Sequence, residues 1–442
     1  MSWSAGSSNI SNISSSSSSS LNTAAPQAWL GDFDSPQLVE LVSEALDHNA
    51  NLQAAAARLD QSISQARISG ANRLPELGAR LNSQRQKISS FGPNATGGVR
   101  FDNHNLGLNL SWELDLWGRL RNQSAAAIAQ VEASQAELEG AYLSLAAQVC
   151  KRWFTYLEAS QQLELAESTE RADAANLNTL ESRFQSGLSP GLDLRRMRVQ
   201  RAAAQAQVAS RQRLLDNAAR TLEILLGRYP DATLVAARPA LPALPRSIPA
   251  GLPSELLERR PDLIAAERQL AAVDQELRAA RKDRLPQISL TASGGSSSQE
   301  FSQLLDSDFS VWSLGTNLTQ PLFQGGRISA NIDRSQALLE QARANYRATA
   351  LQAFLEVESS LAAETFLNTE YAGLAQAAQE ADAAQALAWE QYRQGTSSFI
   401  NTLDAQRSAN ETRSQLLRLR NSLLQNRIDL YLALGGPFLS AS

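Results

Sequence analysis

Two parts of the chain alternate apolar residues with polar residues or glycine at a period of two. The first part contains Leu77, Ala79 and Leu81, and then Leu106, Leu108, Leu110, Trp112 and Leu114. The second contains Ile288, Leu290 and Ala292, and then Trp312, Leu314 and Leu318. This alternation predicts strands with one apolar and one polar face. We therefore expect two strand pairs, at about residues 76–115 and 287–322, whose connecting loops are Ser83–Gly98 and Gly294–Asp308.

The rest of the chain is dominated by helical periodicity. No proline lies between Arg119 and Ser186, where a coiled-coil seam recurs in steps of four and three: Leu138, Tyr142, Leu145, Val149, Arg152, Tyr156, Ala159 and Leu163. Such a helix is roughly 100 Å long at 1.5 Å per residue. The stretch Gly187–Gly191 predicts a turn, followed by a return helix to Gly227. One further helix is expected from Pro36 to about Arg73.

The second half of the chain repeats the first. Leu106-Gly107-Leu108-Asn109-Leu110 recurs as Leu314-Gly315-Thr316-Asn317-Leu318, and the same spacing relates Gly187 to Gly395. Upstream, Arg73-Leu74-Pro75 recurs as Arg284-Leu285-Pro286 with a slightly longer spacing. A repeat of this length predicts two structurally equivalent units, each made of helix, strand, strand, very long helix and return helix.

This repeat defines the expected domain organisation, which is mainly α with a small β part. Residues 1–25 form a Ser-rich leader that we expect to be disordered. Residues 26–229 form the first repeat, residues 230–253 a Pro-rich extended linker, residues 254–437 the second repeat and residues 438–442 a tail.

Composition excludes several classes of function. The net charge of -5, without a dense basic cluster, gives no indication of nucleic-acid binding. The two histidines, His48 and His104, lie on different predicted elements, and neither has Cys, His or Glu partners at metal-ligand spacing. No nucleophile motif of the hydrolase type is present. Cys150 lies beside Val149 on the seam and is expected to be a buried, unreactive thiol. We expect no enzyme activity, no cofactor and no metal.

The four predicted strands cannot form a closed barrel within one chain, because eight is the smallest common number of strands in a membrane barrel. An open sheet edge in lipid leaves backbone groups unpaired, at several kcal/mol each. Two chains would supply eight strands and three chains twelve, and the sequence does not choose between them. The alternative is a soluble coiled-coil scaffold in which the alternating segments form small packed hairpins.

Several short motifs, in their order along the duplicated frame, carry a resemblance to a known family. They are Leu114-Asp115-Leu116-Trp117-Gly118-Arg119, Arg259-Arg260-Pro261-Asp262, Leu285-Pro286, Pro321-Leu322-Phe323, Gly325-Gly326-Arg327, Leu403-Asp404-Ala405-Gln406-Arg407 and Leu432-Ala433-Leu434-Gly435-Gly436. Over about Pro26 to Pro437 the chain resembles the outer membrane efflux family of TolC-like channels, and most closely the lipoprotein branch that serves RND multidrug pumps. That branch carries an acylated N-terminal cysteine, whereas the only cysteine here is Cys150.

The resemblance implies a homotrimer with a 12-stranded β-barrel in outer-membrane lipid, continued by a long α-helical barrel in the periplasm. It implies an exit duct for drugs or other small molecules in a tripartite efflux system. The partners would be a periplasmic adaptor (membrane fusion) protein and an inner-membrane RND-type pump.

The same resemblance assigns roles to individual residues. The adaptor-docking tips would be the turn residues Gly187, Leu188 and Ser189, and Gly395, Thr396 and Ser397. The periplasmic aperture would be formed by Ile400 as an apolar constriction, Asp404 as a ring of carboxylates in the trimer, and Arg407 as a partner in closed-state contacts. The competing interpretations are a plain turn between helices and an exposed Asp404–Arg407 pair worth a few tenths of a kcal/mol.

Aromatic residues near the strand ends suggest a belt at the membrane interface. The candidates are Trp112, Phe309 and Trp312. For Trp117, ordinary packing where the strands meet the helices is an equally good interpretation. The pair Gly325-Gly326 is interpreted as a tight corner between a strand and a helix rather than a phosphate loop, because no Lys-Ser or Lys-Thr follows it.

Overall fold

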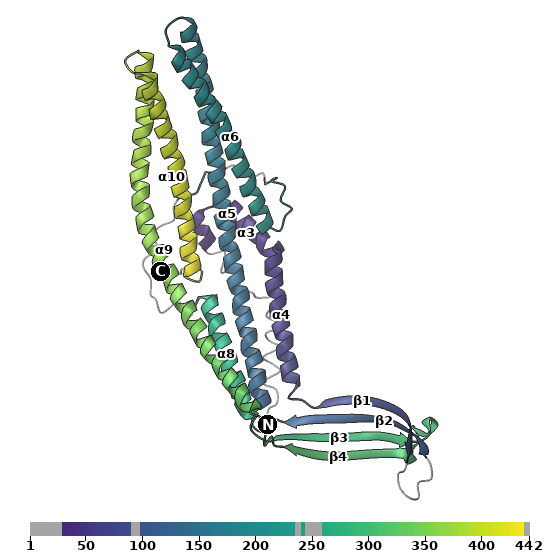
Figure 1. The fold of residues 1–442 in the computed structure, drawn as a ribbon. Helices are drawn as coiled ribbons and strands as arrows, with labels where there is room; N and C mark the ends of the chain where they lie inside the picture. Colours follow the sequence, from purple (N-terminus) through teal and green to yellow (C-terminus); the bar gives the residue numbers. More distant parts are fainter. Residues whose placement is uncertain (1–28, 90–97, 235–239, 244–258, 437–442) are drawn as a thin grey trace. The chain divides into compact units, whose positions relative to one another are not determined.

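The structure is a computed structural model that describes residues 29–89, 98–234, 240–243 and 259–436. The first series of elements comprises the 3₁₀ turn η1 (Gly31–Phe33), α3 (Pro36–His48), α4 (Ala50–Ala71), β1 (Glu76–Ser89), β2 (Gly98–Leu114), α5 (Arg119–Gln185) and α6 (Gly191–Leu225) (Figure 1). The second comprises α8 (Pro261–Lys282), β3 (Gln287–Ser298), the 3₁₀ turns η2 (Phe301–Gln303) and η3 (Ser307–Phe309), β4 (Ser310–Thr319), α9 (Arg327–Arg393) and α10 (Phe399–Ala433). The predicted leader, the tail and most of the linker lie outside the described residues.

The helices confirm the duplication. The long helices α5 and α9 each have 67 residues, and the return helices α6 and α10 each have 35. The helices before the strands, α4 and α8, each have 22. The two copies of a sequence pattern therefore fold into helices of equal length.

The helix predicted from Pro36 to Arg73 is interrupted at Asn49, so the single-helix prediction is wrong. Asn49 has an extended backbone (φ -70°, ψ 121°) between α3 and α4. Its buried side chain accepts hydrogen bonds from the backbone N–H groups of Asn51 and Leu52 and donates one to the carbonyl of Leu225. The side chain thus caps the start of α4, and this local bonding competes with a continuous helix.

The four strands form one antiparallel sheet in the order β1-β2-β3-β4. One line of paired residues across the sheet is apolar throughout: Leu77, Leu110, Ala292 and Leu314. The next line along the strands, from Gly78 to Ser313, is small or polar. The alternating pattern was therefore interpreted correctly as strands with one apolar and one polar face.

The strands are longer than the apolar alternation predicts. Ser83–Ser89 continues β1 and pairs with Gly98–His104 of β2, and Gly294–Ser298 continues β3. The prediction that these segments are loops is wrong. Polar and small side chains dominate both faces there, so the ladder continues on backbone hydrogen bonds without an apolar pattern to reveal it.

Among the described residues, side chains on the apolar face of the sheet are largely exposed. Leu77 is 65% exposed, Leu314 is 75% exposed and Trp312 is 82% exposed. Strands β1 and β4 form the two edges, and each has one side without a strand partner among the described residues. An exposed apolar face with two open edges is typical of a surface that contacts another molecule.

The chain divides into two compact units. The strand unit contains Arg58–Gln135 and Ala265–Arg347, and the helical unit contains the other described residues. None of the described helices carries an apolar stretch long enough to cross a membrane.

In the strand unit, the motif Leu114–Arg119 forms the corner between β2 and α5. The Asp115 carboxylate accepts hydrogen bonds from the N–H groups of Leu120 (3.0 Å) and Arg121 (2.7 Å) and so caps the helix. Gly118 has a φ of 73°, which favours glycine. The Trp117 indole donates to the carbonyl of Pro286 (2.7 Å), at the start of β3. This motif therefore connects the two repeats within the sheet.

The helical unit is built around α5. Its aromatic core joins α5 to the N-terminal segment and α10, with ring centroids 5.1 Å apart for Phe33 and Phe154 and 5.4 Å apart for Trp29 and Tyr431. The predicted seam is only part of the buried surface, because Cys150, Trp153 and Leu157 are also buried. Arg152 is exposed, so its assignment to the buried seam is wrong. Helix α5 has neighbours on several sides, which a two-helix seam does not describe.

Candidate functional site

The two turns between the long and return helices have the same geometry. Gly187 and Gly395 have φ angles of 73° and 76°. In the first turn Gly187 N–H donates to Phe184 O (2.9 Å) and Leu188 N–H to Arg183 O (2.8 Å). In the second, Gly395 and Thr396 make the corresponding bonds. These are Schellman ends of a helix, in which glycine adopts the left-handed conformation and the next N–H donates to the carbonyl five residues earlier.

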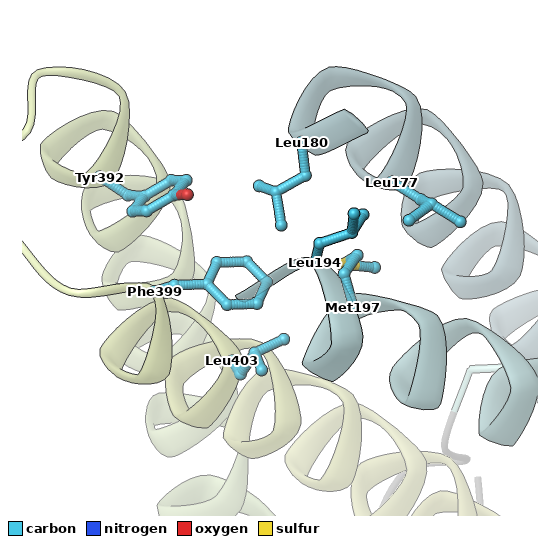
Figure 2. Close-up of a cluster of buried hydrophobic side chains, with 7 residues drawn as sticks. All are labelled: Leu177, Leu180, Leu194, Met197, Tyr392, Phe399 and Leu403. Carbon is cyan, nitrogen blue, oxygen red and sulfur yellow. The ribbon is translucent and has the colours of Figure 1, made fainter. Parts of the chain in front are cut away.

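Behind the turns lies a buried apolar cluster, which we call the tip core (Figure 2). The hairpin α5–α6 contributes one half of it, and the hairpin α9–α10 contributes the other. Its members are Leu177, Leu180, Leu194, Met197, Tyr392, Phe399 and Leu403. The two hairpins of one chain are therefore held together at their tips by side chains that lie about 200 positions apart in the sequence.

Aromatic and polar contacts tie the tip core to the turns. The Phe399 ring lies 5.3 Å from Tyr392 and 6.3 Å from Trp389, measured between centroids. The hydroxyls of Ser189 and Tyr392 are 3.4 Å apart, and the Arg183 guanidinium lies 5.5 Å from the centre of the Tyr392 ring. Tyr392 thus contacts both hairpins, with a cation over its ring face.

The predicted docking residues differ in accessibility. Leu188 is 69% exposed, Gly187, Gly395 and Thr396 are exposed, and Ser397 is half-buried. Ser189 is 8% exposed and faces Tyr392. Among the predicted docking residues, Leu188 and Thr396 therefore present the exposed side chains, whereas Ser189 belongs to the contact between the hairpins.

The predicted aperture residues lie on the first turns of α10. Ile400 is 38% exposed, and Asp404 and Arg407 are exposed. In the part of the chain that the structure describes, Asp404 and Arg407 form no ion pair, with each other or with other groups. All three side chains are available for contacts outside the chain, whereas Phe399 and Leu403 on the same turns of α10 belong to the tip core.

The sheet offers a second surface of functional interest on its polar face. Its lining includes Asn109, Ser111, Ser289, Thr291, Ser293, Ser313 and Asn317. The hydroxyls of Ser293 and Ser313, on neighbouring strands, are 2.8 Å apart. These side chains are small and polar, as expected of a strand surface that borders water.

The predicted aromatic belt residues lie at different levels of the sheet. Trp112 pairs with Leu290 near the helix-proximal end of β2, and its indole donates to Arg73 O (3.0 Å). Trp312 lies near the other end of β4, opposite Gly294. Phe309 lies in η3, immediately before that strand. For Trp117, the hydrogen bond to Pro286 favours the packing interpretation.

Sequence reasoning did not identify the tip core or the buried pair Asp173 and Gln406, which are joined by a 2.5 Å hydrogen bond. Trp389, Tyr392 and Phe399 cluster around Gly395 in an otherwise aromatic-poor part of the chain, and this clustering was an available signal. Gln406 lies within the motif Leu403–Arg407, but no pattern connected it to Asp173.

The candidate site consists of surfaces that can contact other molecules. Among the described residues, no group of three or more His, Cys, Asp or Glu side chains is arranged to hold a metal ion. Burial raises the pKa of the Cys150 thiol well above its ordinary value, so its nucleophilic thiolate is disfavoured. The candidate functional features are the tips, the exposed α10 residues and the two faces of the sheet.

Comparisons with known proteins agree over nearly the whole chain. The family described as outer membrane efflux protein matches residues 41–228 and 252–436. The solvent efflux pump outer membrane protein SrpC of Pseudomonas putida is 33% identical over 419 residues, covering 94% of this chain and 88% of the relative. The cation efflux system protein CusC of Escherichia coli K12 is 32% identical, covering 92% and 88%. The structure of the outer-membrane channel OprN superposes with a TM-score of 0.87 at 29% identity, covering 93% and 92%.

Proposed function

The chain belongs to the outer membrane efflux protein family, and we propose that it forms the exit duct of a tripartite, RND-type efflux system. Its relatives are outer-membrane channels, a class of transport protein without enzyme activity. The finer proposal is that three copies form a 12-stranded barrel continued by a helical barrel in the periplasm. This duct would passively conduct drugs or other small molecules outward, with energy from an inner-membrane pump.

The observation that carries the proposal is the exposed sheet. Its apolar face matches the requirement for contact with outer-membrane lipid, and its polar face matches that of a water-filled lumen. The open edges β1 and β4 would be paired by neighbouring copies, because lipid cannot satisfy backbone N–H and C=O groups. Three copies of a four-stranded sheet supply twelve strands, whereas a soluble scaffold leaves this face without a partner.

The internal repeat predicts the register between copies. Within the chain, Leu110 of β2 pairs with Ala292 of β3. Their repeat equivalents are Leu318 of β4 and Leu81 of β1, which are edge-strand residues. If the copies pair as the repeats do, Leu318 of one copy lies opposite Leu81 of the next, with Cβ atoms about 5 Å apart.

Disulfide cross-linking tests this register. In a Cys150→Ser background, the pair Leu81→Cys and Leu318→Cys is expected to give covalent oligomers that stop at three copies. The matched control, Leu77→Cys with Leu318→Cys, is four residues out of register and is expected to give none. A ladder that stops at two copies would support an eight-stranded barrel instead. Monomers that remain soluble without detergent would favour the scaffold alternative.

We propose that the periplasmic aperture is formed by Ile400, Asp404 and Arg407. Threefold symmetry would bring three exposed Asp404 carboxylates together, and such a ring favours cations. Replacing Asp404 with Ala is expected to raise single-channel conductance in lipid bilayers and to reduce cation selectivity. Unchanged conductance and selectivity would remove Asp404 from the aperture.

We also propose that the tips dock the periplasmic adaptor. Leu188 and Thr396 are the side chains most available for this contact, because both follow the left-handed glycines. Leu188→Glu combined with Thr396→Glu is expected to abolish export without reducing trimer yield. Glu411→Gln, an exposed change farther along α10, serves as the control. Retained export in the double variant would place docking elsewhere.

A further inference from the structure

A buried carboxyl group links the two hairpins behind the tip core. Asp173 of α5 is completely buried (0% exposed), and Gln406 of α10 is 2% exposed. Gln406 Nε2 donates to Asp173 Oδ1 at 2.5 Å. Asp173 lies one helical turn before Leu177, and Gln406 lies three residues after Leu403, both members of the tip core. The pair is therefore part of the same contact that holds the hairpins together.

One oxygen atom of each side chain has no hydrogen-bond donor. Asp173 Oδ2 and Gln406 Oε1 are both buried and have no hydrogen-bond partner among the described residues. If Asp173 is ionised, both atoms are acceptors, and each carries the cost of burial without a donor. If Asp173 is protonated at Oδ2, that O–H can donate to Gln406 Oε1. Acid and amide then form a closed pair with two hydrogen bonds and no buried charge.

The surroundings of Asp173 also favour the protonated form. Burial is the largest influence and raises the pKa of Asp173, the amide side chains of Gln406 and Gln200 lower it, and the negative charge of Glu170 raises it. Glu170 lies on α5 itself, and its Oε1 atom is 3.4 Å from Nε of Arg201 on α6. Helix α6 also presents the neutral Gln200, and α10 presents the neutral Gln406. Within the described part of the chain, Asp173 forms no ion pair with a Lys or Arg side chain.

We propose that Asp173 and Gln406 form a proton-dependent latch between the two hairpins of each chain. The latch is closed while Asp173 is protonated and is weakened when Asp173 ionises. This inference rests on the proposed function, in which Ile400, Asp404 and Arg407 at the start of α10 form the periplasmic aperture, or gate, of the duct.

The direction of the pH dependence follows from the difference in the pKa of Asp173 between the closed and the open arrangement. In the closed arrangement Asp173 is buried, and its pKa lies above the ordinary carboxyl value of 3.8. When the hairpins separate, water solvates the carboxylate and the pKa returns towards that value. The closed state therefore binds the proton more tightly, and acid favours closure. Opening becomes easier as the pH rises from the ordinary pKa through the raised pKa of Asp173. In this range the ratio of open to closed arrangements increases by up to about tenfold per pH unit for each chain.

Planar-bilayer recordings from about pH 4 to about pH 8, a range above the ordinary carboxyl pKa, test the latch. The wild-type open probability is expected to rise with pH. Asp173→Asn introduces a carboxamide that can make both hydrogen bonds but cannot ionise, so this variant is expected to stay closed across the range. Glu411→Gln, a matched loss of an exposed carboxylate, is expected to keep the wild-type profile. A pH profile that survives in Asp173→Asn overturns the latch.

Other outcomes separate the latch from the proposed function. Absence of any channel from the wild-type protein counts against the duct itself. Opening could instead depend on added Ca²⁺ at constant pH and not on pH itself. This result would mean that Asp173 Oδ2 and Gln406 Oε1 hold a cation, and it would overturn the latch. Infrared spectroscopy supplies a readout that does not need conductance. The protonated carboxylic C=O band is expected at acid pH, shifted by Gln406→Met and lost in Asp173→Asn; its absence from the wild-type protein also overturns the latch.

Discussion

Replacing Phe399 with Ala tests whether the tip core holds the hairpins closed. Phe399 is 2% exposed and its ring contacts Tyr392 and Trp389 on the opposing helix of its hairpin. Loss of a fully buried Phe costs about 3–5 kcal/mol through lost burial and the cavity that remains, with about 0.5–1.5 kcal/mol of aromatic pairing within that range. The helical hydrogen bonds of α10 are unaffected. Because Phe399 also shares the tip core with Leu180 and Leu194 of the other hairpin, part of the loss falls on the contact between hairpins.

The expected consequence is an easier opening of the gate. A loss of about 3 kcal/mol in the closed state shifts the balance between closed and open by about 100-fold per chain. The assay is the open probability of single channels in planar bilayers, together with thermal unfolding followed by circular dichroism. Phe399→Ala is expected to raise the open probability and to lower the Tm.

Phe154→Ala is the matched control. Phe154 is equally buried and packs against Phe33 at 5.1 Å, but it lies in the aromatic core around α5 rather than in the tip core. This variant is expected to lower the Tm without raising the open probability. If both variants lower the Tm and neither changes the open probability, the tip core is a stability element only, and the reasoning about the gate is wrong.

Three further predictions concern stability and reactivity. Asp115→Ala removes the cap of α5 and is expected to cost about 1–2 kcal/mol of unfolding free energy, measured by denaturant titration; Asp60→Ala, at an exposed position within α4, should cost much less. Arg260 donates hydrogen bonds to the carboxylate of Glu356 (2.8 Å) and to the carbonyl of Ala433 (3.0 Å). Arg260→Met is therefore expected to lower the free energy of unfolding by about 2 kcal/mol, and a loss below about 0.5 kcal/mol would contradict this role. Because burial raises the pKa of Cys150, maleimide at about pH 8 should label this thiol only after unfolding, and rapid labelling of the folded protein would show that the site is open.

The sequence was sufficient for features that depend on local pattern. Period-two alternation identified the apolar face that includes Leu77, Leu110 and Leu314, because side chains alternate along any strand. The recurring glycines Gly187 and Gly395 marked both turns, since a helix end in the left-handed conformation favours glycine. The duplication then predicted the organisation of both halves.

Features that depend on contacts between distant segments of the chain were not visible in the sequence. Asn49 interrupts a segment of good helix formers because its side chain caps α4 and bonds Leu225, 176 positions away. The outer parts of β1 and β2 pair without an apolar pattern, since their ladder rests on backbone groups that every residue carries.

The tip core and the pair of Asp173 and Gln406 show most clearly the difference between local pattern and tertiary contact. The sequence by itself determined where the long helices end and where the turns after them lie, because turn chemistry and periodicity act over a few residues. Only the tertiary structure decided that Phe399 meets Leu180 and Leu194 in one cluster, and that Asp173 is buried against Gln406. Burial and hydrogen-bond partners depend on which segments pack together, and packing between hairpins about 200 positions apart leaves no periodic trace along the chain.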